Sequence, residues 1–164
     1  MAIGTMEEVI STQPFFTGLE SKLITILVSC ASNRVFHPGE YLCREGEQAD
    51  SFYLIRSGQV TLEVYAPHHG GLRIETLQEG NILGWSWVVP PYRWHFDAKA
   101  MDAVRALALD ARCLREKCEH DHELGYQLLA RFSRLIDERL QTTRRQLLEV
   151  YGREDCIVAP GAHS

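Results

Sequence analysis

The stretch FHPGEYLCREGEQADSFYLIRSGQV, residues 36–60, decides the fold of this chain. Its apolar runs are short, and they are separated by Gly39, Gly46 and Gly58. Glycine readily adopts the positive φ angles that tight turns often need, so this spacing predicts short strands joined by turns.

The same β character continues to about residue 110. Apolar and polar residues alternate over 60–65 and again over 72–75, the period-two pattern of a half-buried strand. The segment PHHGG at 67–71 lies between them and predicts a hairpin loop. Many short strands at close spacing over residues 34–110 predict a β-sandwich, a jelly roll or a barrel.

Helical patterns flank this β zone. On its N-terminal side, TGLE at 17–20 matches a capping box, and apolar residues at helical spacing follow over 23–27. On its C-terminal side, Asp110 is expected to cap a short helix that ends at Cys118.

A long helix is expected from Asp121 to Tyr151, about 45 Å in length at 1.5 Å per residue. Its apolar residues step by threes and fours: Leu129, Phe132, Ile136, Leu140, Thr143, Leu147 and Val150. Because the helix is longer than a domain of this size needs, we expect it to cover the β zone at one end and a partner helix at the other. The predicted homodimer contact comprises Phe132, Ile136, Leu140, Thr143 and Leu147. The alternative is a helix packed wholly on its own domain.

Composition bounds the class of protein. The chain has 164 residues and a net charge of −5, which predicts one globular domain and disfavours binding to nucleic acid phosphates. Since no run of eighteen apolar residues occurs and the N-terminus lacks a signal-peptide pattern, no membrane span is expected. The expected location is the cytoplasm. Residues 152–164, which show no periodicity, are expected to be a disordered tail.

The cysteines carry no pairing signal. The chain has five, none in a C-x-x-C pair, and in a cytoplasmic protein we expect free reduced thiols. Cys118, His120 and His122 form a candidate metal cluster, but positions two apart on a helix do not share a face. We therefore predict no metal site and no cofactor.

Residues 36–60 closely resemble the first half of the cyclic-nucleotide-binding domain family. The segment LQEGNILG at 77–84 resembles the lead-in to the family's phosphate-binding cassette, and FFTGL at 15–19 resembles its opening helix. The resemblance covers about residues 14–151. It implies a mainly β fold with flanking α-helices: a double-stranded β-helix or jelly-roll β-roll, with an N-terminal helix and a long C-terminal helix, forming one domain over residues 1–151.

The cassette departs from the family pattern. In members that bind cyclic AMP or cyclic GMP, it begins Phe-Gly-Glu and ends Arg-x-Ala; the Glu binds the ribose and the Arg the cyclic phosphate. Here residues 84–100 read GWSWVVPPYRWHFDAKA, so Trp85 stands in the place of the Glu and Trp94 in that of the Arg. Arg93 is expected to face the opposite side of its strand. Losing two charge-assisted hydrogen bonds of about 1.5–3 kcal/mol each would weaken binding by roughly two to four decades.

Two interpretations of the cassette remain open. In one, the tryptophans fill the space in which family members bind their nucleotide, and the domain is a scaffold without a ligand. In the other, the pocket is refitted for a nucleotide-like or an aromatic, anionic ligand. The candidate ligand-binding residues are Gly84, Trp85, Ser86, Trp87, Val88, Tyr92, Arg93, Trp94 and His95.

The resulting functional hypothesis is a non-enzymatic ligand-sensing or regulatory module that signals through its long helix. The alternatives are a protein-interaction scaffold and a true cyclic-nucleotide receptor related to the transcription regulators. Direct DNA binding is not expected, because a helix-turn-helix module needs several dozen residues beyond Tyr151. An enzyme of the cupin type needs converging metal ligands, and no motif places such ligands or a catalytic triad here.

Overall fold

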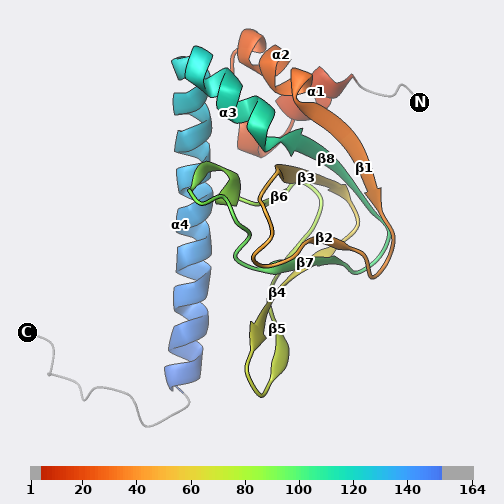
Figure 1. Ribbon diagram of the computed structural model, residues 1–164, viewed down its shortest axis with the longest axis vertical. Helices are drawn as coiled ribbons and strands as arrows, with labels where there is room; N and C mark the ends of the chain where they lie inside the picture. The colour runs from red at the N-terminus through yellow and green to blue at the C-terminus, as the bar shows by residue number, and fades with distance from the viewer. Residues whose placement is uncertain (1–4, 153–164) are drawn as a thin grey trace, which may run out of the picture.

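The computed structural model describes residues 5–152, which form two antiparallel sheets with helices at one end and a long helix along one side (Figure 1). The helices are α1 (Met6–Ser11), η1 (Pro14–Phe16), α2 (Ser21–Ser29), η2 (Ser86–Val88), α3 (Ala111–His120) and α4 (His122–Gly152). The strands are β1 (Ala31–Phe36), β2 (Tyr41–Cys43), β3 (Ser51–Ser57), β4 (Val60–Ala66), β5 (Gly70–Leu77), β6 (Ile82–Leu83), β7 (Asp97–Ala100) and β8 (Val104–Asp110). The β-roll with flanking helices is confirmed. Except for Gly152, the predicted disordered tail lies outside the described residues.

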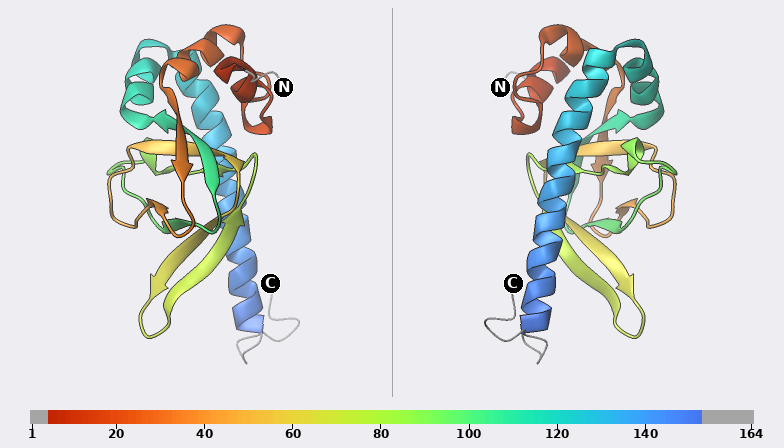
Figure 2. Two further views of the ribbon diagram at one scale, coloured as in Figure 1. Left: turned by 90° about the vertical axis from the view of Figure 1, so that its right-hand side faces the viewer. Right: turned by 90° about the vertical axis from the view of Figure 1, so that its left-hand side faces the viewer.

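Two four-stranded sheets face each other across the core. Their orders are β1-β8-β3-β6 and β2-β7-β4-β5, so strands distant in sequence lie side by side. The largest buried side chains of this interior include Phe52, Leu54, Leu62 and Leu107. The β4–β5 hairpin extends past the other strands of its sheet, at the same end of the molecule as the C-terminal half of α4 (Figure 2). Within the described residues, no helix is long and apolar enough to cross a membrane.

The capping predictions had different outcomes. The capping box at Thr17 is wrong: α2 begins at Ser21, and its N-cap Glu20 makes no side-chain capping bond. The reason is a turn at Gly18, whose φ of +87° leaves Thr17 outside the helix. Asp110 does cap α3, because its carboxylate accepts a hydrogen bond of 2.7 Å from the Cys113 N–H.

The prediction of free thiols is wrong for Cys30 and Cys113, which form a disulfide. Strand pairing explains it: β1 and β8 are antiparallel with Ala31 opposite Leu109, so the residues just before β1 and just after β8 come together. The disulfide joins the end of α2 to the first turn of α3. Among the described residues Cys43 and Cys118 are free, whereas Cys156 lies outside them.

Helix α4 has two apolar faces. The inner face packs on the roll and buries Leu124, Leu128 and Phe132. The outer face, which we call the exposed seam, consists of Tyr126, Leu129, the half-buried Ile136, Leu140, Leu147 and Val150. Thr143, which belongs to the predicted dimer contact, lies at the border of this seam and also lines a cavity between α4 and the roll. The assignment of Phe132 to the dimer contact is therefore wrong, because this side chain is buried on the inner face. It is 1% exposed and lies among Phe15, Phe52 and Trp87, with ring centroids 4.9–5.2 Å away.

Candidate functional site

A cavity of about 180 Å³ lies between the cassette, the β4–β5 hairpin and α4. Leu62 of β4 and Phe96, which comes just before β7, supply one wall, and Trp85 and His95 lie beside them. Helix α4 closes the other side with side chains that include Thr143. The site thus combines apolar side chains of the roll with polar side chains of α4, a segment that is distant from the roll in sequence.

Two cassette residues meet at this cavity as a stacked pair. The rings of Trp85 and His95 lie 4.8 Å apart between centroids and are inclined by 19°. Nδ1 of His95 is 3.0 Å from the hydroxyl of Ser86, which fixes the imidazole against the cassette. The structure therefore brings three predicted site residues together, and the group at position 85 offers an aromatic face and an N–H donor rather than a carboxylate.

Trp94 fills space inside the roll beside the cassette glycine. It is 5% exposed, and a Cβ added to Gly84 would lie 2.6 Å from its Cη2 atom. The backbone of Trp94 is held on both sides, since its N–H donates to the Glu47 carbonyl and its carbonyl accepts from the Gly46 N–H. An indole buried in this way packs as a core residue and offers no positive charge to a ligand.

Arg93 does not reach the cavity. Its side chain is exposed and donates a hydrogen bond of 2.8 Å to the Gly46 carbonyl, and its backbone pairs with Gln48. The neighbours Trp94 and Arg93 thus point to different sides, as the alternation of an extended chain requires.

Trp87 is also a core residue. It is 2% exposed and stacks on Phe52, with ring centroids 5.3 Å apart and an inclination of 22°. With Val88 and Tyr92 it lines a separate crevice against α3 and α4 rather than the cavity beside Trp85. The predicted ligand-binding set is therefore divided between two places.

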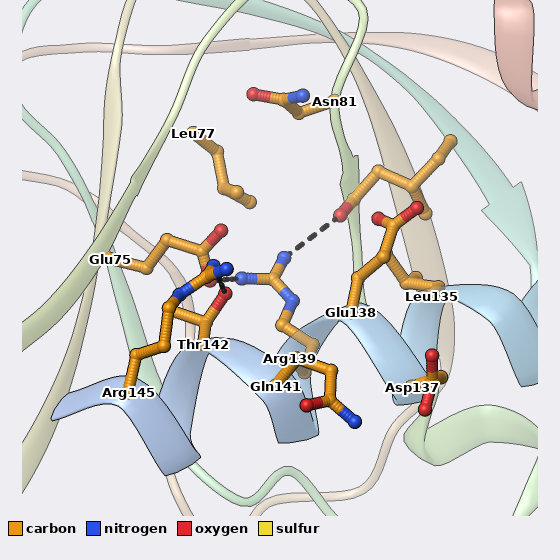
Figure 3. Close-up of a pocket in the computed structure, with 11 residues that line it drawn as sticks. Glu75, Leu77, Asn81, Leu135, Asp137, Glu138, Arg139, Gln141, Thr142 and Arg145 are labelled. Atoms are coloured by element: carbon orange, nitrogen blue, oxygen red, sulfur yellow. Dashed lines mark hydrogen bonds and ion pairs between the residues drawn. The ribbon is translucent and has the colours of Figure 1, made fainter. Parts of the chain in front are cut away.

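The sequence reasoning missed Arg139, which lies between α4 and the hairpin (Figure 3). Its guanidinium forms an ion pair with Glu75 of β5 and donates to the Ile82 carbonyl at 3.4 Å. Burial lowers the pKa of Arg139 to about 10, so it stays positively charged at neutral pH. Further along α4, the side chain of Gln146 donates to the Ile74 carbonyl at 2.6 Å. We call the contacts of Arg139 and Gln146 with β5 the helix latch; they are the ion pair with Glu75 and the hydrogen bond to the Ile74 carbonyl.

The helix latch borders two spaces. Arg139, Glu75 and Thr142 line the cavity beside Trp85. They also line a second hollow of about 360 Å³, whose lining residues Figure 3 shows. One sequence signal marks Arg139: it continues the inner face of α4, where Leu128, Phe132 and Leu135 precede it at helical spacing.

The architecture is thus a β-roll with a cavity that the C-terminal helix closes. Residues 33–121 match the family model of the cyclic nucleotide-binding domain, which covers more than half of the chain. The chain belongs to this family.

Relatives agree with this assignment. A CRP-like cAMP-activated global transcriptional regulator from Mycobacterium tuberculosis is 26% identical over 145 residues, which are 88% of this chain and 63% of the relative. This chain therefore spans less than two thirds of that relative's length.

Among solved structures, a putative cyclic nucleotide-binding protein from Geobacter metallireducens has a TM-score of 0.74 at 23% identity, covering 84% of this chain and 99% of that one. The regulatory subunit of a cAMP-independent protein kinase A from Trypanosoma brucei, a mutant bound to cAMP in its A site, has a TM-score of 0.72 at 22% identity, covering 87% and 50%. These similarities concern the fold.

Proposed function

We propose that this chain is a non-enzymatic ligand-sensing module in which α4 responds to occupancy of the cavity beside Trp85. Cyclic AMP and cyclic GMP are not its ligands in the usual binding mode. The observation that carries this proposal is the pair of indoles in the cassette: Trp85 stacked on His95, and Trp94 packed over Gly84. Neither offers the carboxylate for a ribose or the guanidinium for a cyclic phosphate that the family resemblance leads one to expect.

The cavity favours a flat, aromatic ligand. Trp85 and His95 present stacked rings, and the hydroxyls of Thr142 and Thr143 supply hydrogen bonds from α4. At about 180 Å³ the cavity is smaller than the roughly 300–1,000 Å³ of drug-sized sites, so a larger ligand has to displace the Trp85–His95 stack or α4 itself. Displacing α4 breaks the helix latch, and this couples binding to helix position.

The fold is compatible with such a change of specificity. The Trypanosoma brucei protein of similar fold is described as part of a cAMP-independent kinase, and a mutant of it was seen with cAMP bound. We therefore expect that restoring the two family residues here, Trp85→Glu with Trp94→Arg, creates cyclic AMP binding that the natural chain lacks.

Calorimetric titration with cyclic AMP and cyclic GMP tests this proposal. For the natural chain we expect no micromolar binding, and for Trp85→Glu/Trp94→Arg a gain of roughly two decades or more. Trp85→Gln/Trp94→Gln is the matched control, which opens the same space without the two charges. Micromolar binding of cyclic AMP to the natural chain would show that the chain is a true cyclic-nucleotide receptor.

The second candidate function is a ligand-free scaffold, which the buried Trp94 and the small cavity favour. Native mass spectrometry of freshly purified protein separates the two candidates. A carried small molecule that is lost on Trp85→Ala supports the sensor, and a chain that carries nothing and binds no nucleotide or nucleoside supports the scaffold.

A homodimer through α4 belongs to both candidates. Leu140 is 60% and Leu147 is 53% exposed on the exposed seam, and apolar side chains that gather on a surface in this way favour an interaction site. Sedimentation of Ile136→Asp and Leu140→Asp tests the dimer, with Gln141→Asp on a neighbouring polar position as the control. An unchanged mass for the two seam variants would contradict it.

A further inference from the structure

The crevice formed by Trp87, α3 and the first turns of α4 has a cavity of about 200 Å³, separate from the one beside Trp85. Its apolar wall consists of Trp87, Val88, Tyr92, Leu128 and Leu129. An engineered cavity of about 150 Å³ lined by such side chains is large enough to bind benzene. The crevice therefore has room for one aromatic ring with a small substituent.

Trp87 contributes its ring to this wall. It is 2% exposed, and within residues 5–152 its indole Nε1 has no hydrogen-bond partner. Because this nitrogen has less than 1 Å² of accessible surface, a ligand in the crevice meets the ring of Trp87 and not its N–H. The polar contact of a ligand therefore has to come from another side chain of the lining.

This polar group is a cation. Arg115 of α3 lies with its guanidinium 4.2 Å from the centroid of the Tyr92 ring, and one N–H donates to the Trp87 carbonyl at 2.9 Å. A guanidinium carries five N–H groups, so it can also bind an oxygen anion that enters the crevice. The remaining polar lining is the half-buried thiol of Cys118 and the exposed carboxylate of Glu119 at the rim.

We propose that this crevice is a binding site for a small aromatic carboxylate, whose ring packs on Leu128 and Tyr92 and whose oxygens bind Arg115. Such a ligand would contact the cassette, α3 and α4 at once. Because Leu129 belongs to both the crevice wall and the exposed seam, occupancy would reach the surface proposed for dimerisation. This site does not depend on the ligand of the cavity beside Trp85.

Nuclear magnetic resonance of the full chain labelled with ¹⁵N-tryptophan tests the proposal, because each of the three tryptophans gives one indole signal. The Trp87 signal is assigned by its loss in Trp87→Phe. The probes are benzoate and benzamide, which have the same shape but differ in charge. We expect benzoate to shift the Trp87 signal saturably, because that ring is part of the crevice wall, with about tenfold weaker binding for benzamide.

Two arginine variants distinguish binding in the crevice from a nonspecific effect of positive charge on α3. Arg115→Gln should make benzoate bind no better than benzamide, whereas Arg112→Gln, an exposed arginine on the same helix, should leave the tenfold preference intact. Should Arg115→Gln not fold, Arg115→Met, which also removes the charge, gives the same comparison with the two probes. A Trp87 signal that stays fixed or drifts without saturation overturns the proposal, and so does a saturable shift confined to Trp85 or Trp94.

Discussion

The contact between Gly84 and Trp94 predicts a defined loss of stability when Gly84 is replaced by alanine. A Cβ at this position would lie 2.6 Å and 2.7 Å from Cη2 and Cζ3 of the indole, closer than carbon atoms approach in real proteins. The φ angle of +104° costs an L-residue about 1–2 kcal/mol, and pushing the indole aside adds about 1–3 kcal/mol. We expect Gly84→Ala to lower the free energy of unfolding by about 2–5 kcal/mol.

Two further variants separate the backbone cost from the collision. Gly39 has a φ of +89° and nothing within 4 Å of its virtual Cβ, so Gly39→Ala should show only the backbone cost of about 1–2 kcal/mol. Trp94→Phe removes the outer ring that carries Cη2 and Cζ3. In that background Gly84→Ala should lose its collision, which gives a coupling energy of about 1–3 kcal/mol between the two sites.

Urea unfolding followed by circular dichroism is the assay, since removing a tryptophan would alter a fluorescence signal. The Gly39→Ala and Trp94→Phe pair should be additive within about 0.5 kcal/mol, because the two residues are not neighbours. If Gly84→Ala and Trp94→Phe were additive to the same degree, Trp94 would not lie over the cassette glycine. The argument that an indole replaces the cassette arginine would then fail.

Three more predictions concern the disulfide, a buried thiol and the helix latch. Cys30→Ser/Cys113→Ser should lower the free energy of unfolding by up to about 4.5 kcal/mol, because the disulfide closes a loop with a sequence separation of 83; a thiol count in denaturant that does not rise on reduction would contradict the bond. Burial raises the pKa of the Cys43 thiol above its usual value of 9.0, so only the unfolded chain ionises just above pH 9 and stability falls there. Urea midpoints at pH 8 and pH 10 should show that the natural chain loses about 1 kcal/mol more than Cys43→Ala, and equal losses would refute this. Arg139→Met should destabilise by about 1–3 kcal/mol because it leaves the half-buried Glu75 unpaired; Arg139→Met/Glu75→Met should recover part of that loss, and a double variant less stable than either single one would contradict this.

The fold was predictable because local and global signals agree. Gly58, for example, has a φ of +87°, and a Cβ there would collide with the backbone carbonyl of Ala103. Both the positive φ angle and the lack of space for a Cβ require glycine at this position. Such glycines appear in the sequence as breaks between strand patterns. The long helix and the cap at Asp110 were predictable for a similar reason, since both depend on residues within a few positions of one another.

The errors concern contacts between distant segments. Nothing in the spacing of Cys30 and Cys113 indicates a disulfide, because only the pairing of β1 with β8 brings them together. Phe132 fits the steps of three and four that mark the exposed seam, yet steps of four also mark the inner face with Leu124 and Leu128. A helical period of 3.6 makes the two faces overlap in such a list, and only packing decides between them.

The candidate site also depends on packing that the sequence pattern does not reveal. Three tryptophans within ten residues suggested either a filled pocket or a refitted one, and composition cannot decide between them. In the structure each indole has a different environment: Trp87 packs on Phe52, Trp94 packs over Gly84, and Trp85 stacks on His95 at the cavity. Two of the three rings therefore support the filled interpretation, and one supports the refitted one. Because Trp85 is the cassette indole that lines the cavity under α4, a ligand that moves α4 from within this cavity has to be recognised through that ring.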